Sequence, residues 1–164
     1  MKLRGLCIRW LLVCVVLLCT CLTGCQTPRS ESWLILERTS RPDPEIVSVL
    51  RNLPNPETRR HFPMLLEIRW GYKGLPNGLP TEDELIFART LYTGLDRIVG
   101  GHGMHAMTRT GDGGRTMYYY VDDAAKLQGA IRELFDAQPS MSVKVVARDD
   151  PNWDTVREVL SATN

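Results

Sequence analysis

The residue with the most specific chemistry in this sequence is a cysteine. The chain has 164 residues and five cysteines, all at or before Cys25, which ends the tetrapeptide LTGC at residues 22–25. Small residues before a cysteine leave the backbone open to a protease, and only a thiol can form a thioether with a lipid. Residues 22–25 therefore have the residue types that cleavage before Cys25 and attachment of a lipid to its sulfur would require.

The start of the chain has the composition of an export signal. Lys2, Arg4 and Arg9 precede any acidic residue, and an apolar stretch follows at residues 10–22. This stretch is shorter than the ~20 residues that a membrane-spanning helix needs, and it matches the ~7–15 apolar residues of a secretory signal. We therefore expect residues 1–24 to be a signal peptide.

These two features together resemble the lipobox of bacterial lipoproteins. The resemblance implies a diacylglyceryl group on Cys25 and usually acylation of the new amine, and two or three acyl chains anchor a protein durably to a membrane. It places the protein on the exported side of a bacterial cell membrane, and Gln26 favours the outer membrane if the envelope is Gram-negative. The alternatives are a plain signal peptide with a chance cysteine and an uncleaved anchor helix.

The other four cysteines would leave with the signal peptide. The mature chain would then hold no cysteine nucleophile, no disulfide and no cysteine metal site. Removal of three basic residues and no acid changes the formal net charge from +1 to 1 − 3 = −2. A near-neutral domain lacks the basic surface of a nucleic-acid-binding protein, so we expect no nucleic acid partner.

Other groupings of reactive side chains have simpler explanations. His102 and His105 are three apart in a predicted strand, so they should point to opposite faces and share no metal ion. The acids at 82–84 suit the first turn of a helix, whose dipole they complement. Asp150 and Trp153 either form an acid–aromatic pocket or cap and pack the last helix. We therefore predict no catalytic residue, no metal and no cofactor.

A single domain must position these side chains. We expect residues 25–31 to form a polar tether and residues 32–160 to form one α+β domain. Apolar spacing and Gly, Pro and capping signals predict its elements. They are a strand at 32–39, a helix at 44–53, a loop at 54–63, a strand at 64–72, a loop at 73–80, a helix from Thr81 to Gly100, a hairpin of strands at 104–110 and 115–121 about a turn at 111–114, a helix from Asp123 to before Pro139, a strand at 142–148 and a short last helix around Trp153.

From residue 64 the order of elements is β-α-β-β-α-β, which is typical of the ferredoxin-like fold. We expect a four-stranded antiparallel sheet with two helices on one face, a short N-terminal strand and helix, and a C-terminal helix. Strand residues of the core should meet apolar residues of the two long helices. These residues are Leu66, Ile68 and Trp70 on the strand, and Leu91, Leu95, Ile131 and Leu134 on the helices.

The opposite face of the sheet is the candidate binding face. Strict alternation along the strands assigns cations and tyrosines to it, and Tyr and Arg are enriched at binding hot spots. The alternative is that the tyrosines pack beneath the predicted helix at 44–53. The candidate residues are Arg69, His105, Arg109, Tyr118, Tyr120, Lys144 and Arg148.

Three segments together resemble one bacterial family, catalogued as domain of unknown function 695. They are NGLPTEDE at 77–84, TRTGDGGRTMYYYV at 108–121 and DDPNWDTV at 149–156, and the resemblance covers residues 32–160. Val156 stands where the family pattern implies an aromatic residue. The family in turn resembles the regulator of ribonuclease E activity B, which binds and inhibits a nuclease, but an exported protein would not meet a cytoplasmic ribonuclease.

We therefore expect a lipid-anchored envelope protein that binds another envelope protein or a small ligand without catalysis. Its membrane contact would be the lipid on Cys25. One alternative is an envelope hydrolase or other enzyme with an unrecognised site, and another is a purely structural envelope protein. A concave pocket with converging polar groups would favour an enzyme.

Overall fold

The computed structural model describes residues 32–38, 43–137 and 143–163. The predicted signal peptide at 1–24, Cys25 and the tether at 25–31 lie outside the described residues. Within the described ranges, none of the helices has the length and apolar character needed to cross a membrane.

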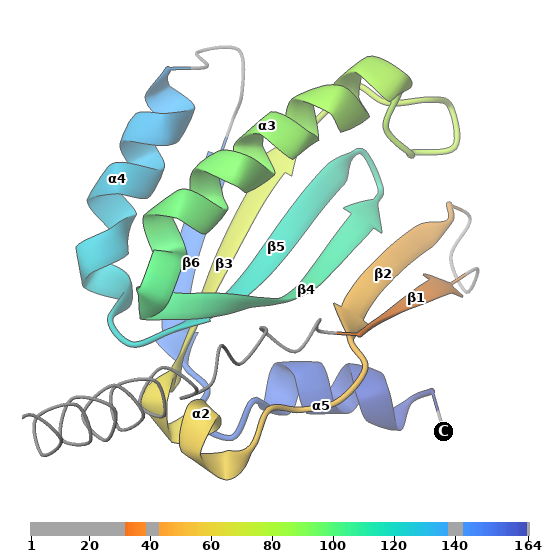
Figure 1. The fold of residues 1–164 in the computed structure, drawn as a ribbon. Helices are drawn as coiled ribbons and strands as arrows, with labels where there is room; N and C mark the ends of the chain where they lie inside the picture. The colour runs from red at the N-terminus through yellow and green to blue at the C-terminus, as the bar shows by residue number, and fades with distance from the viewer. Residues whose placement is uncertain (1–31, 39–42, 138–142, 164) are drawn as a thin grey trace, which may run out of the picture. The chain divides into compact units, whose positions relative to one another are not determined.

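The fold is α+β, as predicted, and is built on one antiparallel sheet of six strands (Figure 1). The strand order across the sheet is β1-β2-β4-β5-β3-β6. The strands are β1 (Trp33–Arg38), β2 (Glu45–Leu50), β3 (Met64–Gly71), β4 (Gly103–Gly111), β5 (Gly114–Val121) and β6 (Val143–Asp149). The helices are α2 (Pro56–His61), α3 (Glu82–Val99), α4 (Ala124–Asp136) and α5 (Asp154–Ser161), with a short 3-10 turn, η2 (Gly100–His102).

Helices α3 and α4 lie on one face of the sheet, here called the first face (Figure 1). Thr81 and Glu84 form the predicted capping box at the start of α3, which satisfies backbone N–H groups that have no partner inside the helix. The predicted core contacts are confirmed: Leu66, Ile68 and Trp70 are buried against Leu91, Leu95 and Ile131, and Leu134 is partly buried beside them.

The sheet has six strands rather than the predicted four because the segment predicted as a helix at 44–53 is a strand. Ile46, Val47 and Val49 are β-branched, and such residues fit a pleated sheet better than a helix. β2 pairs with β4 on one side and with β1 on the other. The apolar spacing that suggested a helix also fits a strand, because in a run this short the two periods are not distinguishable.

A second correction concerns the segment predicted as a loop at 54–63, which contains the short helix α2. The side chain of Asn55 accepts a hydrogen bond from the N–H of Thr58 at 2.8 Å, and Pro56 occupies the first helical position. An Asn followed by Pro is a good helix start, because the proline has no N–H to leave unsatisfied.

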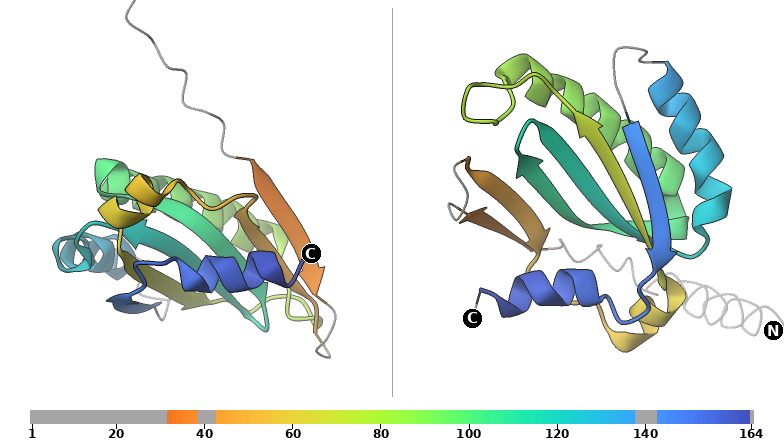
Figure 2. Two further views of the ribbon diagram at one scale, coloured as in Figure 1. Left: turned by 90° about the horizontal axis from the view of Figure 1, so that it is seen from below. Right: turned by 180° about the vertical axis from the view of Figure 1, so that it is seen from behind.

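The C-terminal helix α5 lies on the opposite face, the second face, at its β2–β4–β5 side (Figure 2). The rings of Trp153 and Tyr120 stack with centroids 3.7 Å apart and planes 8° apart. Val156 and Val159 of α5 join Val47 and other residues of the second face in a second apolar cluster. Tyr120 is therefore covered by Trp153 at the start of α5, and the predicted helix at 44–53 that was to cover the tyrosines is a strand of the sheet.

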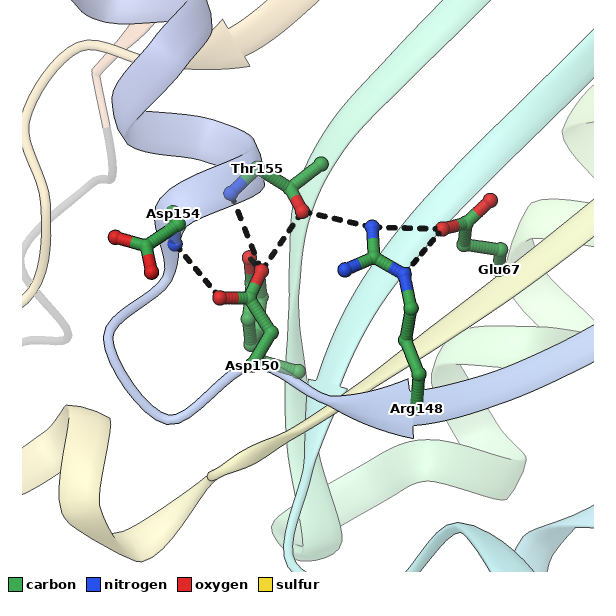
Figure 3. A network of polar contacts seen from close by, with 6 residues as sticks. Glu67, Arg148, Asp150, Asp154 and Thr155 are labelled. Carbon is green, nitrogen blue, oxygen red and sulfur yellow. Dashed lines mark hydrogen bonds and ion pairs between the residues drawn. The ribbon is translucent and has the colours of Figure 1, made fainter.

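Asp150 fixes α5 to the sheet through a buried network (Figure 3). Its carboxylate accepts hydrogen bonds from the N–H of Asp154 at 2.7 Å, from the hydroxyl of Thr155 at 2.7 Å and from the hydroxyl of Tyr120 at 2.6 Å. Burial by itself raises the pKa of Asp150, but these hydrogen bonds outweigh burial and hold the pKa below its ordinary value. Asp150 thus caps the last helix.

Candidate functional site

The central feature of the second face is a row of polar residues that crosses four strands. The pairing of the strands aligns Lys144 of β6 with Arg69 of β3, Arg69 with Thr116 of β5, and Thr116 with Arg109 of β4. Directly opposed residues of neighbouring antiparallel strands have Cβ atoms about 4.5–5.5 Å apart. Three cations therefore lie in one line across the sheet, with a threonine between two of them.

The next row on the same face consists of glycines. Gly71 of β3 pairs with Gly114 of β5, which pairs with Gly111 of β4. Residues two apart in a strand share a face, so these glycines lie beside Arg69, Thr116 and Arg109. Three neighbouring strands thus carry no side chain at this row.

Two of these glycines, Gly111 and Gly114, line an open depression of about 190 Å³. A Cβ atom on Gly114 would lie 3.5 Å from both Nε and Nη2 of Arg69, so this guanidinium folds over the glycine. A Cβ atom on Gly111 would lie 2.7 Å from the carbonyl oxygen of Pro44 and could not fit without a shift. We call this feature the glycine depression. Its lining residues are Glu45, Arg69, Arg109, Gly111, Asp112, Gly114, Thr116 and Tyr118.

Arg109 is held rigidly at one side of the glycine depression. Its Nε and Nη2 donate hydrogen bonds to the two carboxylate oxygens of Glu45 at 3.0 and 2.8 Å, the bidentate geometry that suits a guanidinium. These bonds to Glu45 raise the pKa of Arg109. Tyr118 lies next to it and is only 8% exposed, and burial raises the pKa of its hydroxyl.

Arg69 and Lys144 are different, because both are exposed and neither forms an ion pair with any residue that the structure describes. Arg109 has its charge balanced by Glu45, whereas these two cations face solvent side by side. The glycine depression therefore offers one fixed guanidinium and one free guanidinium, with a lysine beside the free one.

A firm loop borders the glycine depression at the end of the sheet. The hydroxyl of Tyr72 donates to the carbonyl of Gly78 at 3.0 Å, and the N–H of Gly113 donates to the same carbonyl at 3.1 Å. Asp112 and Gly113 both have positive φ, 50° and 61°, as a two-residue turn between antiparallel strands requires. These contacts fix the turn that carries Asp112 at the rim of the depression.

The structure brings together only part of the predicted binding face. Arg69, Arg109 and Tyr118 line the glycine depression, and Lys144 adjoins it. Arg148 lies outside it and donates to Glu67 and to Thr155 (Figure 3). Tyr120 is fully buried beneath Trp153.

His105 lies on the first face, so its assignment to the binding face was wrong. Between His105 and Met107 the pairing of β4 with β5 is irregular, and an extra residue in a strand reverses the alternation of side chains from that point on. The ring of His105 lies between those of Trp33, Tyr92 and Tyr119, with centroids 4.9–5.3 Å away. Burial lowers its pKa to about 4.

Several residues of the glycine depression were not identified from the sequence. Glu45 falls in the segment predicted as a helix, and Thr116 and Gly114 carry no signal by themselves. The pattern TGDGGRT was identified as a hairpin, and pairing its two arms about the turn would have placed Gly111 opposite Gly114. The alignment with Gly71 depends on the pairing of β3 with β5, which the sequence does not reveal.

Elsewhere in the described ranges, no cluster of three or more His, Cys, Asp or Glu side chains is arranged to hold a metal ion. Comparison with protein families matches residues 43–161 to a family described as "Family of unknown function (DUF695)". This confirms the resemblance found from the three sequence segments. No curated protein and no solved structure matches the chain.

Proposed function

The chain belongs to the DUF695 family, whose description assigns no activity, and from that premise we propose that it is a lipid-anchored binding protein of the bacterial envelope. The lipid on Cys25 would hold it on the exported side of the membrane, and the glycine depression would take the ligand. The observation that carries this proposal is the placement of the depression at the end of the sheet opposite to the end where the chain enters.

The pairing of β1 with β2 shows which end of the sheet is which. The chain enters the domain at Ser32, whose carbonyl accepts a hydrogen bond from the N–H of Arg51 at 2.8 Å. Trp33 then pairs with Leu50, whereas Arg38 at the far end of β1 pairs with Glu45 of the depression. Five residues of strand span ~16 Å. A chain anchored upstream of Ser32 would thus present the depression away from its anchor.

The groups in the glycine depression favour recognition over catalysis. The Glu45 carboxylate is occupied by Arg109, and the imidazole of His105 is packed on the other face of the sheet. What remains open is the guanidinium of Arg69, the hydroxyl of Thr116 and the carboxylate of Asp112 at the rim, and a few convergent polar groups of this kind bind and orient a ligand.

We also propose that β3, α3, β4, β5, α4 and β6 form a ferredoxin-like unit to which β1 and β2 add two strands. The order of these elements and the strand order β4-β5-β3-β6 support this. β1 and β2 extend the sheet at its β4 edge and supply Glu45 to the depression.

The anchoring is tested by Cys25→Ser in the full-length chain, because a hydroxyl cannot form the thioether. We expect this variant to lose incorporation of a labelled fatty acid and to leave the membrane fraction or remain unprocessed. Cys21→Ser is the matched control, since that cysteine lies within the predicted signal peptide, and it should be labelled and processed like the wild type. If Cys25→Ser is labelled and sediments with membranes as the wild type does, the lipid anchor is refuted.

A further inference from the structure

We propose that the glycine depression binds a carboxylate group of its ligand, held by Arg69 with Lys144 beside it and Arg109 across from it. This inference rests on the binding role proposed above and specifies the ligand chemistry. Three observations support it: the unpaired neighbouring cations, the acids at the rim and the small size of the hollow.

The first observation is the pairing of two like charges. Arg69 and Lys144 are directly opposed on β3 and β6, and like charges in this position destabilise a sheet. Neither has an acidic partner in the described part of the chain. An anion bound by Arg69 in the depression would offset part of this repulsion, and a guanidinium offers it two parallel N–H donors.

The second observation is the pair of acids that line the same depression, Glu45 and Asp112. Asp112 is exposed, and no ion pair joins it to another described residue. A phosphate near neutral pH carries up to two negative charges and would meet more repulsion from these acids than a carboxylate with one. The net balance of charge therefore favours the monoanion.

The third observation is size. The hollow of about 190 Å³ is smaller than the ~300–1,000 Å³ of pockets that enclose a whole drug-sized ligand. It suits one planar group placed beside the Arg69 guanidinium, with the rest of the ligand outside. Arg109 is already fixed by Glu45, so part of the site is ordered before the ligand arrives.

The test uses the full-length chain in detergent micelles, with amide resonances followed by NMR. The probes are N-acetyl-alanyl-alanine, the same dipeptide with a C-terminal amide, acetate and inorganic phosphate. We expect the two carboxylate probes to shift the amide signals of Gly71, Gly111 and Gly114 with millimolar affinity. The amidated dipeptide should leave these signals in place, and phosphate should bind more weakly than the carboxylates.

Comparison of the two carboxylate probes identifies the source of the carboxylate. Tighter binding of the dipeptide than of acetate supports a peptide C-terminus as the ligand, and equal binding supports a small organic acid. Both outcomes are consistent with the proposed carboxylate site.

Arg69→Gln removes the free guanidinium without leaving a buried acid unpaired. We expect it to weaken carboxylate binding by about tenfold or more, as loss of a charged hydrogen-bonding partner does. Arg148→Gln is the matched control, because it removes the same charge from the same face outside the depression. The affinity of this variant for the carboxylate probes should stay within about twofold of the wild type.

The inference is overturned if the amidated dipeptide or phosphate binds as well as the carboxylates, if no probe shifts the three glycines, or if Arg69→Gln binds like the wild type. If phosphate or the amidated dipeptide binds at these glycines, the depression is still a binding site, and only the proposal that its ligand is a carboxylate is refuted. If the chain binds carboxylates but is never lipidated, the proposed carboxylate site stands and the proposed lipid anchor is refuted.

Discussion

His105 shows at the scale of one residue how the sheet determines a side chain's chemistry. It is enclosed by aromatic rings, and its Nε2 lies 3.0 Å from the carbonyl oxygen of Met107 and 2.9 Å from the hydroxyl of Thr108. Burial lowers its pKa to about 4, although the Met107 carbonyl and the nearby Asp96 carboxylate act in the opposite direction. The histidine is therefore neutral in the folded protein at pH 7.

This environment predicts a loss of stability in mild acid. Below pH ~6.5 the unfolded chain binds a proton at His105, whereas the folded chain does not until pH ~4. The free energy of unfolding should therefore fall by about 3 kcal/mol between these two values. The lowered pKa of Asp150 begins to reduce stability as the pH falls below ~5, so a variant without the histidine is needed to separate the two effects.

Urea unfolding at pH 7, 5.5 and 4.5 measures this fall. His105→Gln should remove most of the fall in the free energy of unfolding between pH 7 and pH 5.5, because glutamine does not titrate. His61→Gln is the control, since His61 is exposed, and it should keep the slope of the wild type. A wild-type protein with the same stability at pH 7 and pH 5 would contradict the prediction.

At the scale of elements, α5 determines which part of the second face is accessible. Trp153 is fully buried, stacks on Tyr120 and donates from Nε1 to the carbonyl of Phe62 at 3.1 Å. Trp153→Ala should lower the free energy of unfolding by about 3–5 kcal/mol, as removal of a large buried aromatic residue does.

Chemical denaturation of the two variants Trp153→Ala and Asn152→Ala checks this prediction. Asn152 is the neighbouring exposed residue, and its variant should stay within about 0.5 kcal/mol of the wild type. A loss of less than about 1 kcal/mol for Trp153→Ala would mean that α5 contributes little to the fold and that the second face is more open than described.

The elements differ in how far the sequence predicts them. Strand β3 and helices α3 and α4 have apolar residues at one clear period over many positions, and their packing was predicted correctly. β2 is six residues long, and over that length helical and strand spacing are not separable. α2 was missed because prolines at 54, 56 and 63 suggested a loop, although Asn55 and Pro56 are a good helix start.

The sequence predicts only part of the candidate site, because side-chain alternation can be followed along one strand but the alignment of neighbouring strands cannot. Strict alternation along single strands places Arg69, Arg109 and Tyr118 correctly on one face. It fails at His105, because the irregular pairing before Met107 is a property of two strands together. The glycine row has the same origin: it joins residues of β3, β4 and β5, and only the alignment of these strands shows that their glycines meet.

At the scale of the whole molecule, the anchor and the glycine depression should be separated along the sheet. Six residues lie between the predicted lipid site at Cys25 and Ser32, and the seven residue-to-residue steps reach at most ~25 Å when extended. The depression begins ~16 Å farther along β1. If the sheet is tethered only at its entry end, Arg51 should stay nearer to the bilayer than Asp112.

Fluorescent labels on Arg51→Cys and Asp112→Cys measure this arrangement. With Cys25 lipidated and the signal peptide removed, each variant would carry one free thiol, so the labelling is specific. The full-length lipidated protein is placed in vesicles that contain an acceptor dye at the lipid headgroups. We expect more efficient energy transfer from position 51 than from position 112, because the tether keeps the entry end near the headgroups. Equal transfer from both positions would contradict the prediction that the entry end of the sheet stays nearer to the bilayer than the depression.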